Sequence, residues 1–234
     1  QHIGDLQNIA TLESFQREIG YFCTMFNVEP QVLAYDLHPD YLSTRYALEQ
    51  GGCVKKLGVQ HHHAHLASVL AEHDHHEAVI GLIFDGTGYG TDGCLWGGEV
   101  LIGDCCTYQR AAHLGPLPLP GGEQAIREPW RVGLAAAILA LPREELESAL
   151  PQWLRPMGWQ TLVRIVEQGI YAPVSTGMGR LFDAVAAIAG VGVRVNYEGQ
   201  AAVELEQLLD ERIDGRYCFT IQQKKDAPWV VDQR

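Results

Sequence analysis

The chain has 234 residues, 47% of them hydrophobic and 20% charged, which is ordinary for a globular protein and excludes a disordered or fibrous one. Its formal net charge of −12 argues against a nucleic-acid surface, because phosphate binding depends on clustered Lys and Arg. No apolar run approaches the roughly 20 residues that cross a bilayer, and the N-terminus lacks a signal pattern. We therefore expect a cytoplasmic protein with neither a nucleic-acid nor a membrane partner.

The first part of the chain alternates helical and strand-like segments. Apolar residues recur every three or four positions in the helical ones, whereas the strand-like ones are short and rich in branched apolar side chains. We expect helices at 11–27, 40–51 and 61–73. We expect strands at 32–37, 54–59 and 78–84. This alternation predicts an α/β layer.

A sequential meander follows, from the apolar strand 78–84 through two further strand-like segments, CLWGGEVLIGD and CTYQRAAHLG. The Pro- and Gly-rich stretch 115–131 then predicts a long ordered loop or a lobe boundary, and the rest of the chain is helical. We expect helices at 131–141, 143–150, 160–168, 177–190 and 199–212. The expected organisation is a first lobe over 1–114 with metal and phosphate motifs, followed over 115–234 by a loop and a helical part that lead into a second lobe.

Seven of the ten histidines lie between His61 and His76. In a helix that begins at His61, residues i and i+4 share a face, so His61 and His65 project side by side. Two neutral imidazoles at this spacing can bind Zn²⁺ or Fe²⁺. No glutamate stands between them where a metalloprotease has its general base, which disfavours that chemistry. A solvated helix surface is the alternative for the pair, and the better interpretation of His73, His75 and His76.

The segment DGTGYGTDG follows the apolar strand. Asp85 ends that strand, and Gly86, Gly88 and Gly90 can take positive φ and present backbone amides to an anion. In such an acidic chain, backbone amides or a metal have to receive an anionic ligand. A glycine-rich hairpin without a ligand is the alternative. No G-K-[ST] follows and a strand comes next, so the segment is neither a Walker loop nor a Rossmann fingerprint.

A third candidate is STGMGRLFD, a glycine-bearing helix start with Asp183 inside the helix. Helix N-termini receive phosphate or ribose oxygens well. Gly177 and Gly179 could equally allow close helix packing, and this segment alone leaves both interpretations open.

Five segments together resemble the HypF carbamoyltransferase family of [NiFe]-hydrogenase maturation. In chain order they are DLHPDYLSTRYA, VQHHHAHLASVLAEH, DGTGYGTDGCLWGGE, PLPGGEQAIREPWR and STGMGRLFDAVAAIAG. The resemblance covers nearly the whole chain and corresponds to the family's Kae1-like domain. It implies an α/β fold of the actin and Hsp70 type, with RNase H-like lobes and with a metal and a nucleotide bound between them.

The resemblance also implies the site residues. It makes His61 and His65 ligands of one divalent metal, Zn or Fe, and lets Asp85 supply a carboxylate to the same ion. The nucleotide would be ATP or carbamoyl adenylate. The residues implied to bind its phosphate, ribose and base are Gly86, Thr87, Gly88, Gly90, Gly179 and Asp183.

In this family, carbamoyl phosphate and ATP form carbamoyl adenylate elsewhere in the full-length protein. The Kae1-like domain then transfers the carbamoyl group to the C-terminal cysteine of HypE, and the thiocarbamate becomes a cyanide ligand of the hydrogenase iron. We therefore expect a HypE-type acceptor and carbamoyl adenylate as partners. The given sequence lacks the regions that form carbamoyl adenylate and the later segments that complete the second lobe and add a metal-binding aspartate. We expect an incomplete second lobe and an incomplete overall reaction.

Three other interpretations stay open. An O-carbamoyltransferase of the antibiotic-biosynthesis type also has an aspartate after its first strand, whereas the enzymes that form threonylcarbamoyladenosine have an S-G-G-H turn where this chain has DGTGYG. The second interpretation is an inactive module that docks a partner. The third is an actin-like ATPase lobe with surface histidines.

Overall fold

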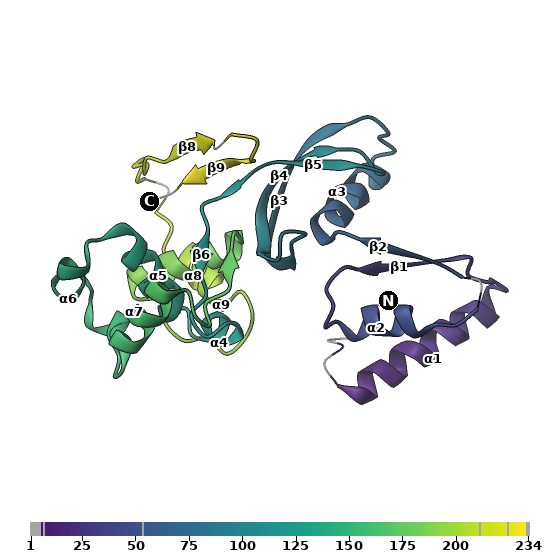
Figure 1. Cartoon of the computed structure of the whole chain (residues 1–234), viewed down its shortest axis with the longest axis horizontal. Coiled ribbons are helices and arrows are strands. Elements are labelled where there is room, and N and C mark those ends of the chain that lie inside the picture. The colour runs from purple at the N-terminus through teal and green to yellow at the C-terminus, as the bar shows by residue number, and fades with distance from the viewer. Residues whose placement is uncertain (1–5, 7, 53, 211, 224, 233–234) are drawn as a thin grey trace. The chain divides into compact units, whose positions relative to one another are not determined.

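Figure 1 shows the computed structural model of the chain, which describes residues 6, 8–52, 54–210, 212–223 and 225–232. The chain falls into two compact units, Gln1–Ala64 and His65–Arg234. The boundary between them lies inside one continuous helix, α3 (His61–Glu72).

The first unit contains two helices and a parallel pair of strands, as the sequence predicts. Its elements are α1 (Ile9–Met25), β1 (Val32–Asp36), α2 (Leu42–Glu49) and β2 (Lys55–Val59). Asp36 lies opposite Val59 where both strands end, and α2 is the crossover that parallel strands require. The Thr44 hydroxyl of α2 donates to the Asp36 carbonyl at 2.7 Å. Phe15 of α1 packs edge-on against Tyr46 of α2, with the ring centroids 5.5 Å apart. These contacts fix the end of β1.

The second unit is built on one sheet with the strand order β6-β7-β4-β5-β9-β8, and β3 pairs with β4. The strands are β3 (Val79–Tyr89), β4 (Leu95–Gly103), β5 (Tyr108–Leu114), β6 (Leu117–Pro118), β7 (Val174–Ser175), β8 (Thr220–Gln223) and β9 (Trp229–Asp232). The first three form the predicted antiparallel meander, whereas β7 joins β4 and β9 joins β5 in parallel. One sheet thus connects residues on both sides of the predicted boundary at 114/115, and the division into two lobes stays a prediction.

Helix α3 packs on the meander through an apolar contact. Leu66 and Leu70 of α3 are buried with Ile83 and Leu101 of the strands. Gly81 of β3 permits this approach, since a Cβ there would lie 2.6 Å from Leu66 Cδ1. The C-terminal part of α3 is thereby held against β3.

The helical part of the second unit has its core along α5 and α8. Its helices are α4 (Glu123–Arg127), α5 (Trp130–Ala140), α6 (Leu146–Ala149), α7 (Trp159–Gln168), α8 (Met178–Ala189) and α9 (Gln200–Glu206), with 3₁₀ turns at Arg143–Glu145 and Gln152–Leu154. One apolar cluster surrounds Leu134 and the other surrounds Leu119, both fully buried. Ala187 of α8 belongs to the first cluster and Ala184 to the second. The position of α8 is therefore fixed by both clusters.

The helix predicted at 143–150 is only a 3₁₀ turn followed by one helical turn. Pro142 and Pro151 bound this stretch, and a proline supplies no amide for a continuing helix. The helix predicted at 199–212 ends at Glu206, and residue 211 lies outside the described residues.

Two further segments differ from the prediction. The stretch 115–131 contains β6 and α4 as well as loop, and the hairpin of β8 and β9 follows where no strand is predicted. Strands of two to four residues carry too little periodicity to be recognised, because their pairing partners decide whether they form.

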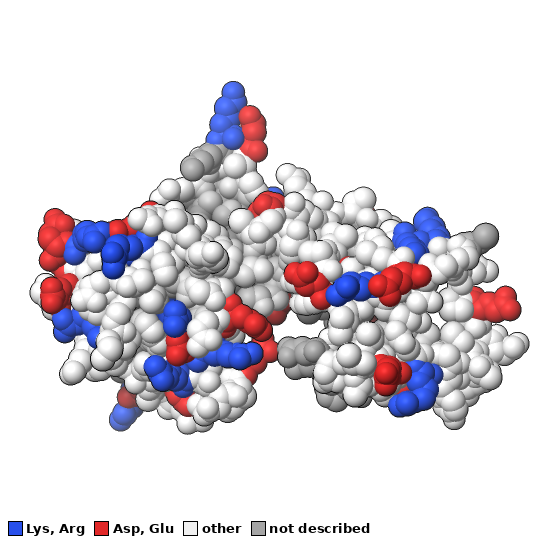
Figure 2. All heavy atoms as spheres, turned by 60° about the horizontal axis from the view of Figure 1, so that its bottom comes forward, with Lys and Arg blue, Asp and Glu red and all other residues white. Residues whose placement is uncertain are grey.

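The charged side chains on the described surface are mixed in sign. Acidic and basic side chains are interleaved on the face of each unit shown in Figure 2, and no continuous basic patch forms among the residues coloured there. None of the described helices has both the length and the apolar character needed to cross a membrane.

Leu101→Ala should lower the free energy of unfolding by about 2–5 kcal/mol, because the side chain is 0% exposed in the core between α3 and the meander. Ile102→Ala is the matched control. The next residue on β4 is 43% exposed, so its loss should cost less than about 1 kcal/mol. Denaturant unfolding followed by tryptophan fluorescence measures both. Equal losses would contradict the assigned core.

Candidate functional site

The first turn of α3 divides the histidine cluster into two kinds. The Gln60 side-chain oxygen accepts a hydrogen bond from the His63 amide at 2.9 Å, and its amide nitrogen lies 3.1 Å from His62 Nδ1. His62 is fully buried and His63 nearly so, whereas His61 is half-buried and His65 is exposed. The middle pair therefore belongs to the packing of the helix start, and the outer pair is available to a ligand.

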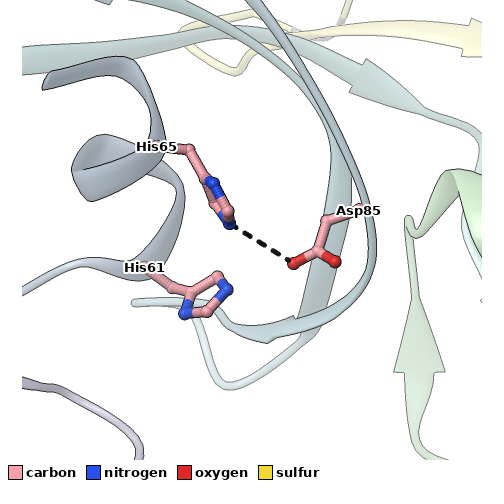
Figure 3. Close-up of side chains that lie close together, drawn as sticks. All are labelled: His61, His65 and Asp85. Atoms are coloured by element: carbon pink, nitrogen blue, oxygen red, sulfur yellow. Dashed lines mark ion pairs between the residues drawn. The ribbon is translucent and has the colours of Figure 1, made fainter. Parts of the chain in front are cut away.

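His61 and His65 of α3 and Asp85 of β3 come together. One ligand atom of each lies within 4.8 Å of the other two, and His65 Nε2 is 4.0 Å from Asp85 Oδ2 (Figure 3). Two imidazoles and a carboxylate are a donor set that suits Zn²⁺ or Fe²⁺. Bonds of about 2.0–2.2 Å to one ion allow its ligand atoms to be up to about 4 Å apart. The three side chains therefore fit a divalent metal after small rotations.

Asp85 lies in an irregular part of β3. The pairing with β4 shifts register between Phe84 and Gly88, and the Gly86 amide donates to Asp85 Oδ1 at 2.6 Å. One carboxylate oxygen is thus held by the backbone, while the other, Oδ2, is the one nearest His65. This arrangement orients the carboxylate before any ligand binds.

The glycine-rich segment is part of a strand rather than a turn. β3 continues through it, and the chain reverses later, with Gly93 at a φ of 80°. The prediction that Gly86, Gly88 and Gly90 take positive φ is wrong, since the positive-φ glycines of the described chain include none of them. At least at Gly90 the requirement is space, because a Cβ there would lie 2.2 Å from Trp96 Nε1.

Backbone meets backbone beside Asp85. A Cβ on Gly97 of β4 would lie 2.6 Å from the Asp85 carbonyl oxygen, and one on Gly177 would lie 2.2 Å from the Gly86 carbonyl oxygen. A Cβ on Gly179, in the first turn of α8, would lie 2.9 Å from Gly86 Cα. Only glycine allows such close backbone approach. The two glycine motifs, far apart in the sequence, therefore contact each other at the N-terminus of α8.

The other predicted nucleotide-binding residues of the hairpin lie farther along it. Thr87 is half-buried, whereas Gly88 and Gly90 are buried, and Gly88 pairs with Trp96 in the ladder between β3 and β4. Direct binding of a nucleotide by any of these residues stays a prediction.

Asp183 is buried in α8 together with Arg180. The two are 4% and 3% exposed, and Arg180 Nη2 lies 2.9 Å from Asp183 Oδ2. Burial raises the pKa of Asp183 to about 6; Arg180 opposes the rise and Glu198 adds to it. Arg180 Nη2 also lies 3.8 Å from the position of a Cβ on Gly86. Glu198 Oε1 lies 3.6 Å from the same position, so Arg180 and Glu198 bring charges of opposite sign to the contact between the glycine motifs, a feature that the sequence did not single out.

A buried ionic network supports this contact and escaped the motif analysis. Glu99 of β4 is 0% exposed; its Oε2 accepts from Arg110 Nε at 2.6 Å. Its Oε1 accepts from the Gly97 amide at 3.2 Å and from the Thr176 hydroxyl. The Arg110 guanidinium lies 4.0 Å from the centroid of the Trp96 ring. A lone glutamate within the apolar strand LWGGEVLIG is the signal that could have identified it, because buried charges need partners.

Asp36 is a second residue that the motifs did not assign. Its Oδ2 lies 2.6 Å from His61 Nδ1. Like Asp85, it directly follows a run of apolar residues in the sequence, and that shared pattern is the signal that could have identified it.

Two family models cover most of the chain: "HypF Kae1-like domain" matches residues 1–72, and "Carbamoyltransferase, Kae1-like Domain, second subdomain" matches residues 81–234. Carbamoyltransferase HypF2 of Cupriavidus necator is 48% identical over 214 residues, which are 90% of this chain and 26% of that protein. A crystal structure of full-length HypF in the phosphate- and nucleotide-bound form aligns with a TM-score of 0.87 and 40% identity, covering 100% of this chain and 30% of that one. HypF of T. kodakarensis aligns at a TM-score of 0.80 and 32% identity, covering 93% and 30%. The chain thus spans less than a third of these proteins.

Asp183→Asn tests the raised pKa. The carboxyl holds its proton more tightly in the folded chain, with a pKa of about 6 against an ordinary 3.8, so stability falls as pH rises through this interval. The asparagine variant lacks this titration. Between about pH 4 and pH 7, the unfolding free energy of the wild type should fall by about 2–3 kcal/mol relative to that of the variant.

Asp214→Asn, at a side chain that is 96% exposed, is the control; because it keeps Asp183, its unfolding free energy should follow that of the wild type over the same pH range. Denaturant unfolding at a series of pH values measures all three proteins. A difference between wild type and Asp183→Asn that is flat, or that rises with pH, contradicts the assignment.

Proposed function

The chain belongs to the HypF carbamoyltransferase family and has the α/β fold of its Kae1-like domain, and from this we propose that it is the carbamoyl-transfer part of the enzyme. In this proposal it binds carbamoyl adenylate together with a divalent metal, Zn or Fe, and passes the carbamoyl group to the C-terminal cysteine of a HypE-type acceptor. The observation that supports the proposal best is the convergence of His61, His65 and Asp85 beside the contact between the two glycine motifs.

His61, His65 and Asp85 would hold the metal. A divalent ion bound there supplies Lewis-acid polarisation of an acyl or phosphate oxygen. The Gly86 amide already holds Asp85 Oδ1 at 2.6 Å, which leaves Oδ2 toward the ion. His62 and His63 are buried and are not members of the group formed by His61, His65 and Asp85, so α3 would supply two ligands.

The N-terminus of α8 would receive the anionic part of the nucleotide. A helix N-terminus carries a partial positive charge and amides that suit a phosphate. Gly177 and Gly179 bring this terminus into backbone contact with Gly86, next to Asp85, and the Arg180 guanidinium, paired with Asp183, lies nearby together with Glu198. In a chain with a net charge of −12, the backbone amides at this helix start would be the groups that receive an anion.

The transfer itself replaces one acyl bond by another. The bond between the carbamoyl carbon and a phosphate oxygen of AMP breaks, and AMP leaves with the electron pair. The acceptor sulfur bonds to the same carbon, and the thiol proton is released. The part of the chain described above has to hold the phosphate and the acyl group in place, which needs donors and positive charge rather than a nucleophile of its own.

His61→Ala and His65→Ala should each weaken the binding of Zn²⁺ and Fe²⁺ by at least about 100-fold, because each removes one of three ligands. His76→Ala, at a side chain that is 82% exposed, should bind like the wild type. Competition with a chromophoric chelator measures the dissociation constants. Wild-type metal affinity in both His61→Ala and His65→Ala would rule out this site.

Supplied carbamoyl adenylate should carbamoylate a peptide with the acceptor's C-terminal cysteine, and mass spectrometry of the peptide measures the product. The same peptide ending in serine should remain unmodified, because the proposed acceptor is a thiol. Transfer to a small-molecule alcohol instead would favour an O-carbamoyltransferase. Binding of the peptide without any transfer would favour a docking module.

A further inference from the structure

Asp36 makes one contact with each of its carboxylate oxygens. Its Oδ1 accepts from the His38 amide at 2.8 Å, and its Oδ2 lies 2.6 Å from His61 Nδ1. The first contact holds the loop that leaves β1. The second reaches one of the proposed metal ligands, and no feature of the loop requires it.

The fold brings Asp36 to this place. Parallel strands end at the same edge of a sheet, and Asp36 at the end of β1 lies opposite Val59 at the end of β2. Only Gln60 separates β2 from α3, so His61 starts the helix beside that edge. The Thr44 hydroxyl fixes the Asp36 carbonyl at 2.7 Å. The aspartate is therefore held on both its backbone and its side chain before it meets His61.

The chemistry of this contact is directional. A neutral imidazole carries one N–H and one lone pair, and a metal binds at the lone pair. A carboxylate can only accept, so the proton of neutral His61 lies on Nδ1 when that atom faces Asp36. The lone pair is then on the other ring nitrogen, Nε2. In Figure 3 one ring nitrogen of His61 lies on the side of Asp85 and the other points away from it.

We propose that Asp36 is a positioning residue for the metal site: it fixes the ring orientation and the Nδ1–H tautomer of His61 so that Nε2 faces Asp85 and His65. The inference rests on the proposed metal site but concerns a residue outside the ligand set. A contribution to stability is a weak explanation for the pair. His61 and Asp36 are 27% and 20% exposed, and ion pairs with access to water add little to folding.

Asp36→Asn tests the proposal on the full 234-residue chain. Asparagine has the same shape and keeps an oxygen for the His38 amide, but its NH₂ group facing His61 would donate to Nδ1 and favour the Nε2–H tautomer. Zn²⁺ affinity, measured by chelator competition, should fall by about 10- to 100-fold. Asp40→Asn, an exposed aspartate on the same loop, removes the same charge and should leave the affinity unchanged.

Equal zinc affinity in wild type and Asp36→Asn would overturn the proposal, and so would an equal loss in Asp40→Asn, since that would indicate a general charge effect. Thermal unfolding without metal should be the same in all three proteins. If Asp36→Asn unfolds earlier, Asp36→Glu decides. It keeps an acceptor for His61, and restored affinity supports the proposal while unrestored affinity overturns it.

The tautomer gives a readout that needs no metal. Long-range ¹H–¹⁵N spectra of the metal-free chain, recorded about two pH units above the ordinary imidazole pKa, should show His61 as Nδ1–H in the wild type and shifted toward Nε2–H in Asp36→Asn. The His61 signal is assigned by its loss in His61→Ala. An Nε2–H tautomer in the wild type would overturn the proposal even if zinc binds, whereas absent zinc binding with the expected tautomer would count only against the proposed metal function.

Discussion

The candidate site depends on the close approach of three backbone segments that leave no room for a Cβ atom. Gly97 of β4 lies against the carbonyl of Asp85, Gly98 lies against the carbonyl of Thr176, and Gly177 lies against the carbonyl of Gly86. Any side chain at these glycines would push α8 away from β3. The proposed anion position at the start of α8 and the proposed metal ligand on β3 are neighbours only because this contact is made without side chains.

A buried ion pair between Glu99 and Arg110 lies beside this contact and supplies side-chain hydrogen bonds, which the glycines cannot make. Glu99 accepts hydrogen bonds from Arg110, from Thr176 and from the Gly97 amide, so one fully buried carboxylate links β4, β5 and the segment before α8. A buried charge is unfavourable unless its partners are all in place. The network therefore favours one arrangement of these segments over nearby alternatives, which suits a site whose metal ligands and anion-binding amides come from different elements.

The histidines at the start of α3 differ in burial and in their neighbours. His62 and His63 are buried with Gln60 at the start of α3, and His65 is exposed near Asp85. His61 has a carboxylate on each side, with Asp36 at its Nδ1 and Asp85 within reach of the metal group. The density of histidine in QHHHAH thus combines two residues buried at a helix start with two proposed metal ligands in the same stretch of the helix.

The sequence by itself determined the main elements and selected the two histidines proposed as ligands. Periodicity located α1 to α3 and the meander, and the i, i+4 spacing selected His61 and His65 out of seven clustered histidines, because local geometry is fixed by local chain order. The family resemblance added Asp85, and the structure brings all three together.

Only the tertiary structure decided the rest. The need for glycine at the contact with α8, the burial of Asp183, the partners of Glu99 and the approach of Asp36 to His61 all arise between segments distant in the chain. The positive φ expected at Gly86, Gly88 and Gly90 failed for the same reason: glycine is required there, at least in part, by what packs against the strand, and no local pattern records that. The short strands β8 and β9 likewise exist because β9 pairs with β5 and β8 pairs with β9, which periodicity within four residues cannot reveal.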